Sequence, residues 1–190
     1  MGEPNQKPGR VLGAVLAGGL SSRFGSDKAL ALLDGRSLLD RAIAMLGAHC
    51  DGVVVVGRTV PGQVCLADRP RGGMGPLGGI AAALHHGAAH GYASVLTVAV
   101  DSVGIDAEGL ALLAPPPACC ESQPVIGHWP AGAGAVVDAI LAGDGRHSLR
   151  ALAQALGARM VTFARAPGNI NTPADLAAAQ GRDGGEGGGT

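Results

Sequence analysis

Residues 11–28 read V-L-G-A-V-L-A-G-G-L-S-S-R-F-G-S-D-K, and this stretch decides the fold class. Residues 11–17 form a short, continuous apolar run that ends at Gly18 and Gly19. An apolar run of this length is typical of a strand that is buried on both faces, as in a parallel sheet covered by helices. The stretch therefore predicts a first buried strand that leads directly into a glycine-rich loop.

Apolar runs and helical patterns alternate along the rest of the chain. Ser37 can cap a helix, on which Leu39, Ala42 and Leu46 then share one face. Strands are expected at residues 52–57, 94–100, 124–128 and 159–163. Further helices are expected at residues 78–90, 108–113, 133–142, 148–156 and from Pro173 onward. This alternation predicts an α/β fold, a Rossmann-like three-layer α/β/α sandwich with a mostly parallel sheet.

The length and composition of the chain favour one folded domain. With 190 residues, of which 47% are hydrophobic, the chain can build a core without disulfides or a structural metal. Residues 1–9 are predicted to be a flexible polar lead, and residues 181–190 (G-R-D-G-G-E-G-G-G-T) a flexible glycine-rich tail. Residues 10–180 are predicted to form the single domain.

Charge and composition exclude some classes of partner. The net charge is −1, and the aromatic residues are one Trp, one Tyr and two Phe. Such a chain neither attracts nucleic acid over distance nor stacks on its bases, so we expect no nucleic-acid partner. No apolar run reaches the roughly 18 residues that a membrane-spanning helix needs, and residues 1–10 lack the apolar core of a signal peptide. We therefore expect a cytoplasmic protein that is not associated with a membrane.

Cysteines and histidines do not form a recognisable metal motif. No C-x-x-C pair occurs among the four cysteines, which are Cys50, Cys65, Cys119 and Cys120. His85, His86 and His90 lie on one predicted helix and cannot all point toward one metal ion. We therefore expect reduced thiols and exposed helical histidines.

The loop after the first strand has the composition of a phosphate-binding loop. Its glycines let backbone N–H groups approach an anion, while Arg23 and Lys28 supply charged contacts to phosphate oxygens. The loop is not a Walker A loop, because Ser26 and Asp27 separate Gly25 from Lys28. Since ligands of open α/β sheets bind at the carboxyl ends of the strands, this loop and Asp101, which follows residues 94–100, are expected at one edge.

The same loop resembles a known signature, L-A-G-G-x-S-x-R-x-G-x-D-K, of nucleotidyltransferases that couple a sugar, polyol or pterin phosphate to a nucleotide. Three further matches follow in the same order along the chain. They are G-P-L-G-G at residues 75–79, Asp101 at the end of a buried strand, and N-I-N-T-P-A-D-L at residues 169–176. Over about residues 11–178 the chain is therefore similar to the molybdenum cofactor guanylyltransferase family.

The resemblance implies roles for particular residues. Arg23, Lys28 and Asp101 would be catalytic, and Asp101 would hold Mg²⁺ against the triphosphate. Asp68 would contact the guanine nucleotide, because a carboxylate can accept hydrogen bonds from both N1–H and N2–H of guanine. The residues implied to bind nucleotide or pterin are Leu16, Ala17, Gly18, Gly19, Lys28, Asp68, Gly75, Gly78, Asp101, Asn169 and Asn171. The last two would lie on the pterin side. The family usually has D-x-P where this chain has Asp101-Ser102-Val103.

The implied reaction is transfer of GMP from GTP to molybdenum-molybdopterin, with release of pyrophosphate. The pterin phosphate is already ionised and needs no general base, which agrees with a sequence that offers no convincing Ser-His or Cys-His arrangement. The expected partners are GTP, molybdenum-molybdopterin and a molybdenum cofactor carrier or molybdoenzyme protein.

Two other functions fit the same motifs. One is a cytidylyltransferase that acts on molybdopterin or on a sugar or polyol phosphate, although L-A-G-G and G-P-L-G-G favour guanylyl transfer. The other is a non-catalytic nucleotide-binding chaperone of a molybdoenzyme. Binding of GTP without release of pyrophosphate would distinguish the chaperone from an enzyme.

Overall fold

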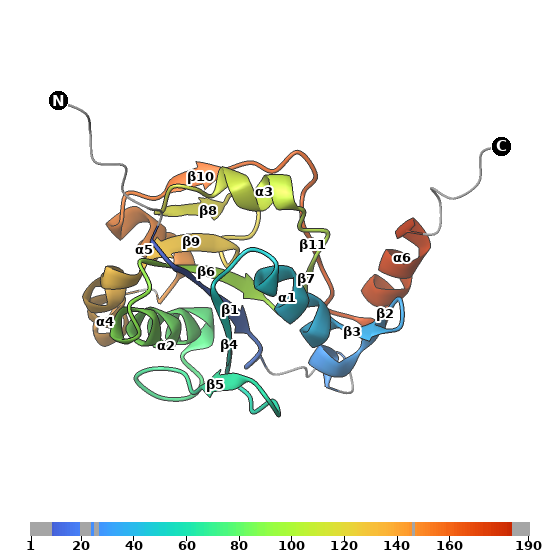
Figure 1. The fold of residues 1–190 in the computed structure, drawn as a ribbon, viewed down its shortest axis with the longest axis horizontal. Helices are drawn as coiled ribbons and strands as arrows, with labels where there is room; N and C mark the ends of the chain where they lie inside the picture. Colours follow the sequence, from blue (N-terminus) through green and yellow to red (C-terminus); the bar gives the residue numbers. More distant parts are fainter. Residues whose placement is uncertain (1–8, 20–23, 25–26, 146, 184–190) are drawn as a thin grey trace.

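A seven-stranded sheet crosses the middle of the computed structural model, which describes residues 9–19, 24, 27–145 and 147–183 (Figure 1). The strand order is β10-β8-β9-β6-β1-β4-β5. In chain order the strands are β1 (Val11–Leu16), β4 (Gly52–Val56), β5 (Val64–Leu66), β6 (Ser94–Ala99), β8 (Ala118–Cys120), β9 (Gly127–Pro130) and β10 (Arg159–Val161). Only β9 runs antiparallel to its neighbours in this sheet, so the predicted, mostly parallel sheet is confirmed.

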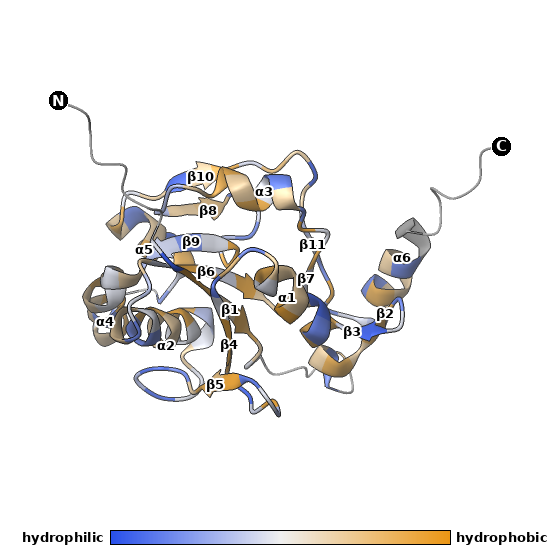
Figure 2. Cartoon of the chain, in the orientation of Figure 1, coloured by the Kyte–Doolittle hydropathy of each residue, from blue (hydrophilic) through white to orange (hydrophobic). Residues whose placement is uncertain are grey.

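Helices cover both faces of the sheet. One face carries α1 (Leu38–Gly47) and α3 (Ala107–Leu112); the other carries α2 (Gly75–Ala89), α4 (Gly134–Ala142) and α5 (Leu149–Ala155). Successive strand residues point to opposite faces. Val15 and Val55 accordingly pack on the α1 side, whereas Ala14 and Val54 pack on the α2 side. Apolar side chains of the central strands β1, β4 and β6 therefore pack on both faces of the sheet, and the three-layer sandwich is confirmed. The apolar residues of these strands are coloured orange in Figure 2.

Smaller elements lie around the sheet. They are the 3-10 helices η1 (Lys28–Leu30) and η2 (Ala131–Ala133), the antiparallel pair β2 (Leu32–Leu33) and β3 (Arg36–Ser37), the antiparallel pair β7 (Ser102–Val103) and β11 (Gly168–Asn169), and α6 (Pro173–Asp183). Helix α6 lies beside β2 and β3 (Figure 1), where the Gln180 side-chain amide donates to the Leu32 carbonyl at 3.2 Å. Residues 1–8 and 184–190, which include most of the predicted lead and tail, lie outside the described residues.

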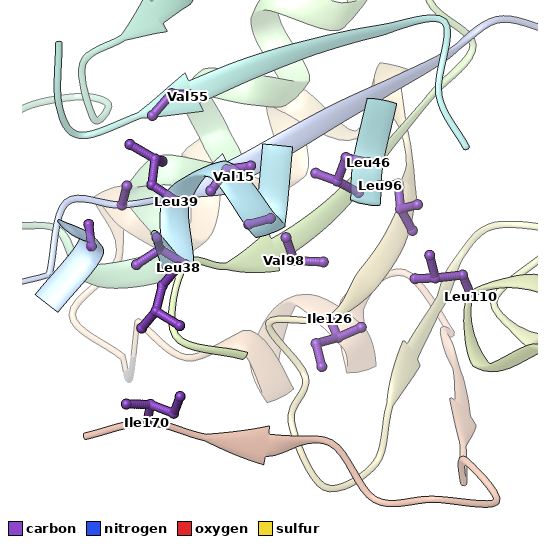
Figure 3. Packing of buried hydrophobic residues seen from close by; sticks show 14 of the residues in the cluster. Val15, Leu38, Leu39, Leu46, Val55, Leu96, Val98, Leu110, Ile126 and Ile170 are labelled. Carbon is purple, nitrogen blue, oxygen red and sulfur yellow. The ribbon is translucent and has the colours of Figure 1, made fainter. Parts of the chain in front are cut away.

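Helix α1 begins where its sequence predicts. The Ser37 hydroxyl accepts a hydrogen bond from the Asp40 backbone N–H at 3.0 Å and thereby caps the first turn. Leu39 and Leu46 are buried, and Figure 3 shows both in the same cluster of buried side chains as Val15 of β1. This packing holds the segment that precedes α1, including η1, against the sheet.

Helix α2 lies close to the sheet because its buried face carries small residues. A Cβ added at Gly87 would lie 3.0 Å from the Val95 side chain of β6, and a Cβ at Gly79 would lie 3.1 Å from Leu16 of β1. The close approach brings the first turn of α2 to the carboxyl ends of these strands. Although α2 is apolar, the described part of the chain contains no helix that is both long and apolar enough to cross a membrane.

The region around β8 and β9 differs from the prediction. The strand expected at residues 124–128 begins later, at Gly127, because residues 123–126 form a turn in which the Ile126 N–H donates to the Gln123 carbonyl at 2.9 Å. Cys119 and Cys120 lie in β8, a strand that was not predicted, and both thiols are buried. Tertiary packing decides both strands, since β9 pairs with β6 on one side and with β8 on the other.

A buried histidine joins β9 to β6. His128 is 8% exposed, and its Nε2 lies 2.8 Å from the Ser94 hydroxyl. Burial lowers the pKa of His128 from its ordinary value of 6.5, while a hydrogen bond with the Leu113 backbone opposes this shift. Burial and the neighbouring His90 also lower the pKa of His86. At these two histidines the unfolded chain therefore binds more protons than the folded chain at pH values around and just below about 6.5.

From this linkage we expect the free energy of unfolding to fall as the pH decreases from about 7 to about 5. Replacing His128 by Gln, which retains hydrogen-bonding groups but cannot be protonated, should make this fall shallower. Denaturant titrations across that pH range measure the effect, and His49→Gln, at an exposed position, is the matched control. An unchanged slope in His128→Gln would show that His128 does not contribute to acid sensitivity.

Candidate active site

A cavity of about 350 Å³ lies at the carboxyl ends of β1, β4 and β6. Its walls include Leu16 at the end of β1, Val56 at the end of β4 and Ala99 at the end of β6. The predicted site residues that line this cavity are Leu16, Ala17, Gly18, Gly19, Lys28, Asp68, Gly75 and Asp101. The glycine turn after β1 and Asp101 after β6 therefore share the edge that the strand pattern predicts.

Two glycines allow neighbouring strand ends to approach closely at this edge. The Ala17 N–H donates to the Val56 carbonyl at 2.8 Å. The segments that follow β1 and β4 then pass each other at Gly18 and Gly57. Gly57 has a φ of +88°, and a Cβ built on it would lie 2.4 Å from the Gly18 Cα. A side chain at position 57 would therefore displace the backbone that lines the cavity. Gly57 was not among the predicted site residues.

Lys28 and Asp101 form an ion pair in the cavity wall. The Lys28 ammonium donates to Asp101 Oδ2, and both side chains are only 15% exposed. The same ammonium lies 3.5 Å from Asn171 Oδ1. The Asp101 carbonyl accepts from the Ile170 N–H at 3.0 Å, which holds the segment of Asn171 beside Asp101. Three segments that are far apart in the sequence thus place a cation, a carboxylate and an amide together.

The turn after Asp101 has Val103 where the family that the sequence resembles usually has proline. Hydrogen bonds hold this turn instead. The Ser102 hydroxyl donates to Gln123 Oε1 at 3.0 Å, and Gln123 Nε2 donates to the Pro167 carbonyl at 2.7 Å. Val103 pairs with Gly168 in the β7–β11 ribbon. Backbone pairing and the Gln123 amide therefore hold the turn after Asp101 in place.

An ion pair that was not predicted lies next to Lys28. Asp27 accepts from both terminal nitrogens of Arg58, with 3.1 Å between Arg58 Nη1 and Asp27 Oδ1. This hydrogen bonding, together with the positive charge of Arg58, lowers the pKa of Asp27. Asp27 also caps η1, because its Oδ1 accepts from the Ala29 N–H at 3.2 Å. The available signal was the position of Arg58 just after a predicted strand, at the same edge of the sheet.

The first turn of α2 forms another wall of the cavity. Gly75 and Pro76 both line it, and none of the side chains that the structure describes caps this helix at Met74. The N–H groups and the positive end of the helix dipole attract anions at such a terminus. Asp68 lies on the loop before α2, and its Oδ1 is 3.6 Å from the point that a Cβ added to Gly79 would occupy. The cavity thus combines cationic and N–H groups with an acidic side chain.

Some predicted residues lie outside the cavity wall. Gly78 packs against the loop of Asp68: a Cβ there would lie 2.6 Å from the Met74 Cβ, and the Gly78 carbonyl accepts from the Arg69 N–H at 3.1 Å. Asn169 pairs with Ser102 in the β7–β11 ribbon. Asn171 reaches the site through its contact with Lys28. Arg23 lies outside the described residues.

Solved structures share the fold that carries this cavity. Molybdopterin-guanine dinucleotide biosynthesis protein A from Archaeoglobus fulgidus matches with a TM-score of 0.72 at 21% identity, over 91% of this chain and 98% of that chain. The 2-C-methyl-D-erythritol 4-phosphate cytidylyltransferase from Thermus thermophilus matches with a TM-score of 0.58 at 17% identity, over 88% of this chain and 96% of that chain. These similarities concern the fold alone.

Sequence comparison identifies the family. A protein named molybdenum cofactor guanylyltransferase from Acidiphilium cryptum (strain JF-5) is 35% identical over 180 residues, which cover 87% of this chain and 92% of that protein. The family model of the MobA-like NTP transferase domain matches residues 13–168, the part of the chain that builds the sheet and most of the cavity. With its fold, its site and its sequence in agreement, this chain belongs to the MobA-like NTP transferase family of nucleotidyltransferases.

Proposed function

We propose that this nucleotidyltransferase transfers GMP from GTP to molybdenum-molybdopterin and releases pyrophosphate. One observation carries the proposal. A single cavity joins the glycine turn after β1, the Lys28–Asp101 pair and the start of α2, in a chain similar to molybdenum cofactor guanylyltransferases. The product would pass to a carrier or molybdoenzyme protein, and we propose that the reaction takes place in the cytoplasm.

The triphosphate would lie between the glycine turn and the start of α2. Gly18, Gly19 and Gly75 have no side chain to keep an anion from the backbone, and all three line the cavity. Lys28 supplies a positive charge in the same wall. We propose the same role for Arg23. Such fixed charges and N–H groups neutralise a triphosphate without having to reorganise during the reaction.

Asp101 is the proposed ligand of Mg²⁺. No group of three or more His, Cys, Asp or Glu side chains among residues 9–19, 24, 27–145 and 147–183 is arranged to hold a metal ion. A single carboxylate nevertheless fits this ion, because Mg²⁺ is commonly held by one or two carboxylates together with substrate phosphates. When bound, Mg²⁺ would neutralise charge on the phosphates during transfer. Asp101 would then have two partners, the ion and Lys28.

The proposed reaction mainly requires the protein to position the pterin phosphate and GTP relative to each other. An oxygen of the pterin phosphate attacks the α-phosphorus of GTP, and a new P–O bond forms as the bond to the bridging oxygen breaks. Pyrophosphate leaves with the electron pair of that bond. The attacking oxygen is already ionised, so the protein need not remove a proton. We propose that Asn169 and Asn171 bind the pterin side and that Lys28 neutralises charge on the phosphates.

Asp68 is the proposed reader of the base. It lines the cavity from the loop before α2, whereas Lys28 lines it from η1. Its carboxylate can accept from both N1–H and N2–H of guanine, a pair of donors that cytosine, adenine and uracil do not present together. Gly78 would help to hold Asp68 in place, because it packs against the loop that carries Asp68.

Equilibrium binding of GTP, CTP, ATP and UTP, with and without Mg²⁺, tests the proposal. We expect the wild-type protein to prefer GTP. Replacing Asp68 by Ala should weaken GTP binding by about 10- to 100-fold, the effect of losing a hydrogen-bonded charge, and leave CTP binding nearly unchanged. Asp144→Ala, which removes an exposed carboxylate that lies away from the cavity, is the control.

The other outcomes are equally informative. Preference for CTP would support the cytidylyltransferase alternative. Tight GTP binding without release of pyrophosphate, in the presence of Mg²⁺ and molybdenum-molybdopterin, would support the chaperone alternative. Equal loss of GTP and CTP binding in Asp68→Ala would show that Asp68 holds the site together rather than reading the base.

A further inference from the structure

Arg58 lies one residue beyond the glycine contact at the end of β4. Gly57 packs on Gly18, so the backbone that carries Arg58 is in contact with the backbone that begins the glycine loop. From this position the Arg58 guanidinium binds both carboxylate oxygens of Asp27. The Arg58 side chain is 22% exposed. The segment Gly57–Arg58 therefore contacts two described flanks of the loop, one at Gly18 and the other at Asp27.

Asp27 connects this contact to the proposed phosphate-binding lysine. It immediately precedes Lys28, and its carboxylate accepts from the Ala29 N–H at 3.2 Å, so it caps the 3-10 turn that carries Lys28. Arg58 and Ala29 thus fix the Asp27 carboxylate from two directions. Because a bidentate guanidinium contact restricts the orientation of its partner, the direction in which η1 starts is also restricted.

A contribution to stability alone does not explain where the Arg58–Asp27 ion pair lies. Partly exposed ion pairs contribute little to the free energy of folding. Asp27, however, lines the cavity, whereas Arg58 is not among the described residues that line it. Arg58 therefore contacts the site through Asp27.

We propose that Arg58 is a positioning residue, which acts through Asp27 to hold Lys28 in its phosphate-binding position. The proposal rests on the proposed function of the cavity. It extends the site to a residue outside the cavity wall, in the segment that follows β4 beside the glycine loop. The planar fork of arginine is important here, since a lysine at position 58 would supply the charge without the two parallel hydrogen bonds.

A double-mutant cycle with Lys28 tests this proposal, with equilibrium binding of GTP as the measurement. We expect Arg58→Gln to weaken GTP binding by about tenfold in the wild-type background. In the Lys28→Ala background the same change should alter binding by less than about twofold, because the side chain on which it acts is gone. Arg58→Lys should restore only part of the loss.

Two further measurements separate positioning from damage to the fold. Binding of guanosine, which lacks phosphates, should be unchanged in Arg58→Gln. Arg41→Gln is the matched control, because Arg41 also pairs with an aspartate, Asp34, at 3.2 Å, but does not line this cavity. It should leave GTP binding unchanged.

The results that overturn the proposal are specific. A tenfold loss in both backgrounds would show that Arg58 acts independently of Lys28, and an equal loss of guanosine binding would show a general structural role. If the wild-type protein binds CTP rather than GTP, the cycle is measured with CTP, and the positioning role is judged separately from the proposed substrate. If the wild-type protein binds no nucleoside triphosphate, both proposals fail.

Discussion

Replacement of Asp101 by Asn is expected to lower the rate of GMP transfer by about 10²- to 10³-fold, the size of effect seen when one group that stabilises transition-state charge is lost. Asn has nearly the same shape and can still accept from Lys28, but it lacks the negative charge with which a carboxylate attracts Mg²⁺. Steady-state release of pyrophosphate, measured over a range of Mg²⁺ concentrations, detects the change. The apparent Mg²⁺ requirement should rise as well.

The control for Asp101 is Asp144→Asn, which changes an exposed carboxylate outside the cavity and should retain the wild-type rate. Thermal unfolding of both variants checks that the fold survives. A rate and a Mg²⁺ requirement that are both unchanged in Asp101→Asn would contradict the proposal that Asp101 holds Mg²⁺. The cavity would then need another cation ligand.

Replacement of Lys28 by Ala is expected to weaken GTP binding by about 10- to 100-fold, because a charge-assisted hydrogen bond contributes roughly 1.5–3 kcal/mol. The lost binding energy should come only from contacts with the phosphates. Guanosine, which has none, should therefore bind the variant as tightly as it binds the wild-type protein. The variant also leaves Asp101 without the ammonium that it binds in the structure. Isothermal titration calorimetry measures the affinities for GTP and for guanosine.

A matched control for Lys28 is Arg165→Ala, which also removes a cation but at an exposed position away from the cavity. Its affinity for GTP should not change. Wild-type affinity in Lys28→Ala would contradict the proposed phosphate-binding role of this loop. A parallel loss of guanosine binding would instead indicate that the ion pair with Asp101 maintains the shape of the cavity.

Local patterns were sufficient to predict the layers of the fold. The apolar runs at β1, β4 and β6 required burial on both faces, and alternate residues such as Val54 and Val55 do pack on opposite sides of the sheet. The cap at Ser37 depends on residues only three positions apart, so it too was predictable. These features follow from interactions along one segment of chain.

Strands β8 and β9, unlike β10, could not be located in the same way. The Thr97 hydroxyl of β6 donates to the Val125 carbonyl at 2.8 Å and accepts from Trp129 Nε1 at 3.0 Å. These contacts hold residue 125 in the turn and residue 129 in the strand. The start of β9 at Gly127 therefore depends on a partner about 30 positions earlier in the chain, which the local apolar pattern does not contain.

For the site itself, the sequence alone determined that the glycine turn after β1 and Asp101 after β6 belong to one edge, since the carboxyl ends of parallel strands share an edge. Only the tertiary structure decided that Lys28 lies against Asp101 and Asn171, that Gly57 packs on Gly18, and that Arg58 binds Asp27. Each of these contacts joins segments that are distant in the chain. Their distances depend on how closely the strands pack and where each turn points, which the order of residues along any single segment does not specify.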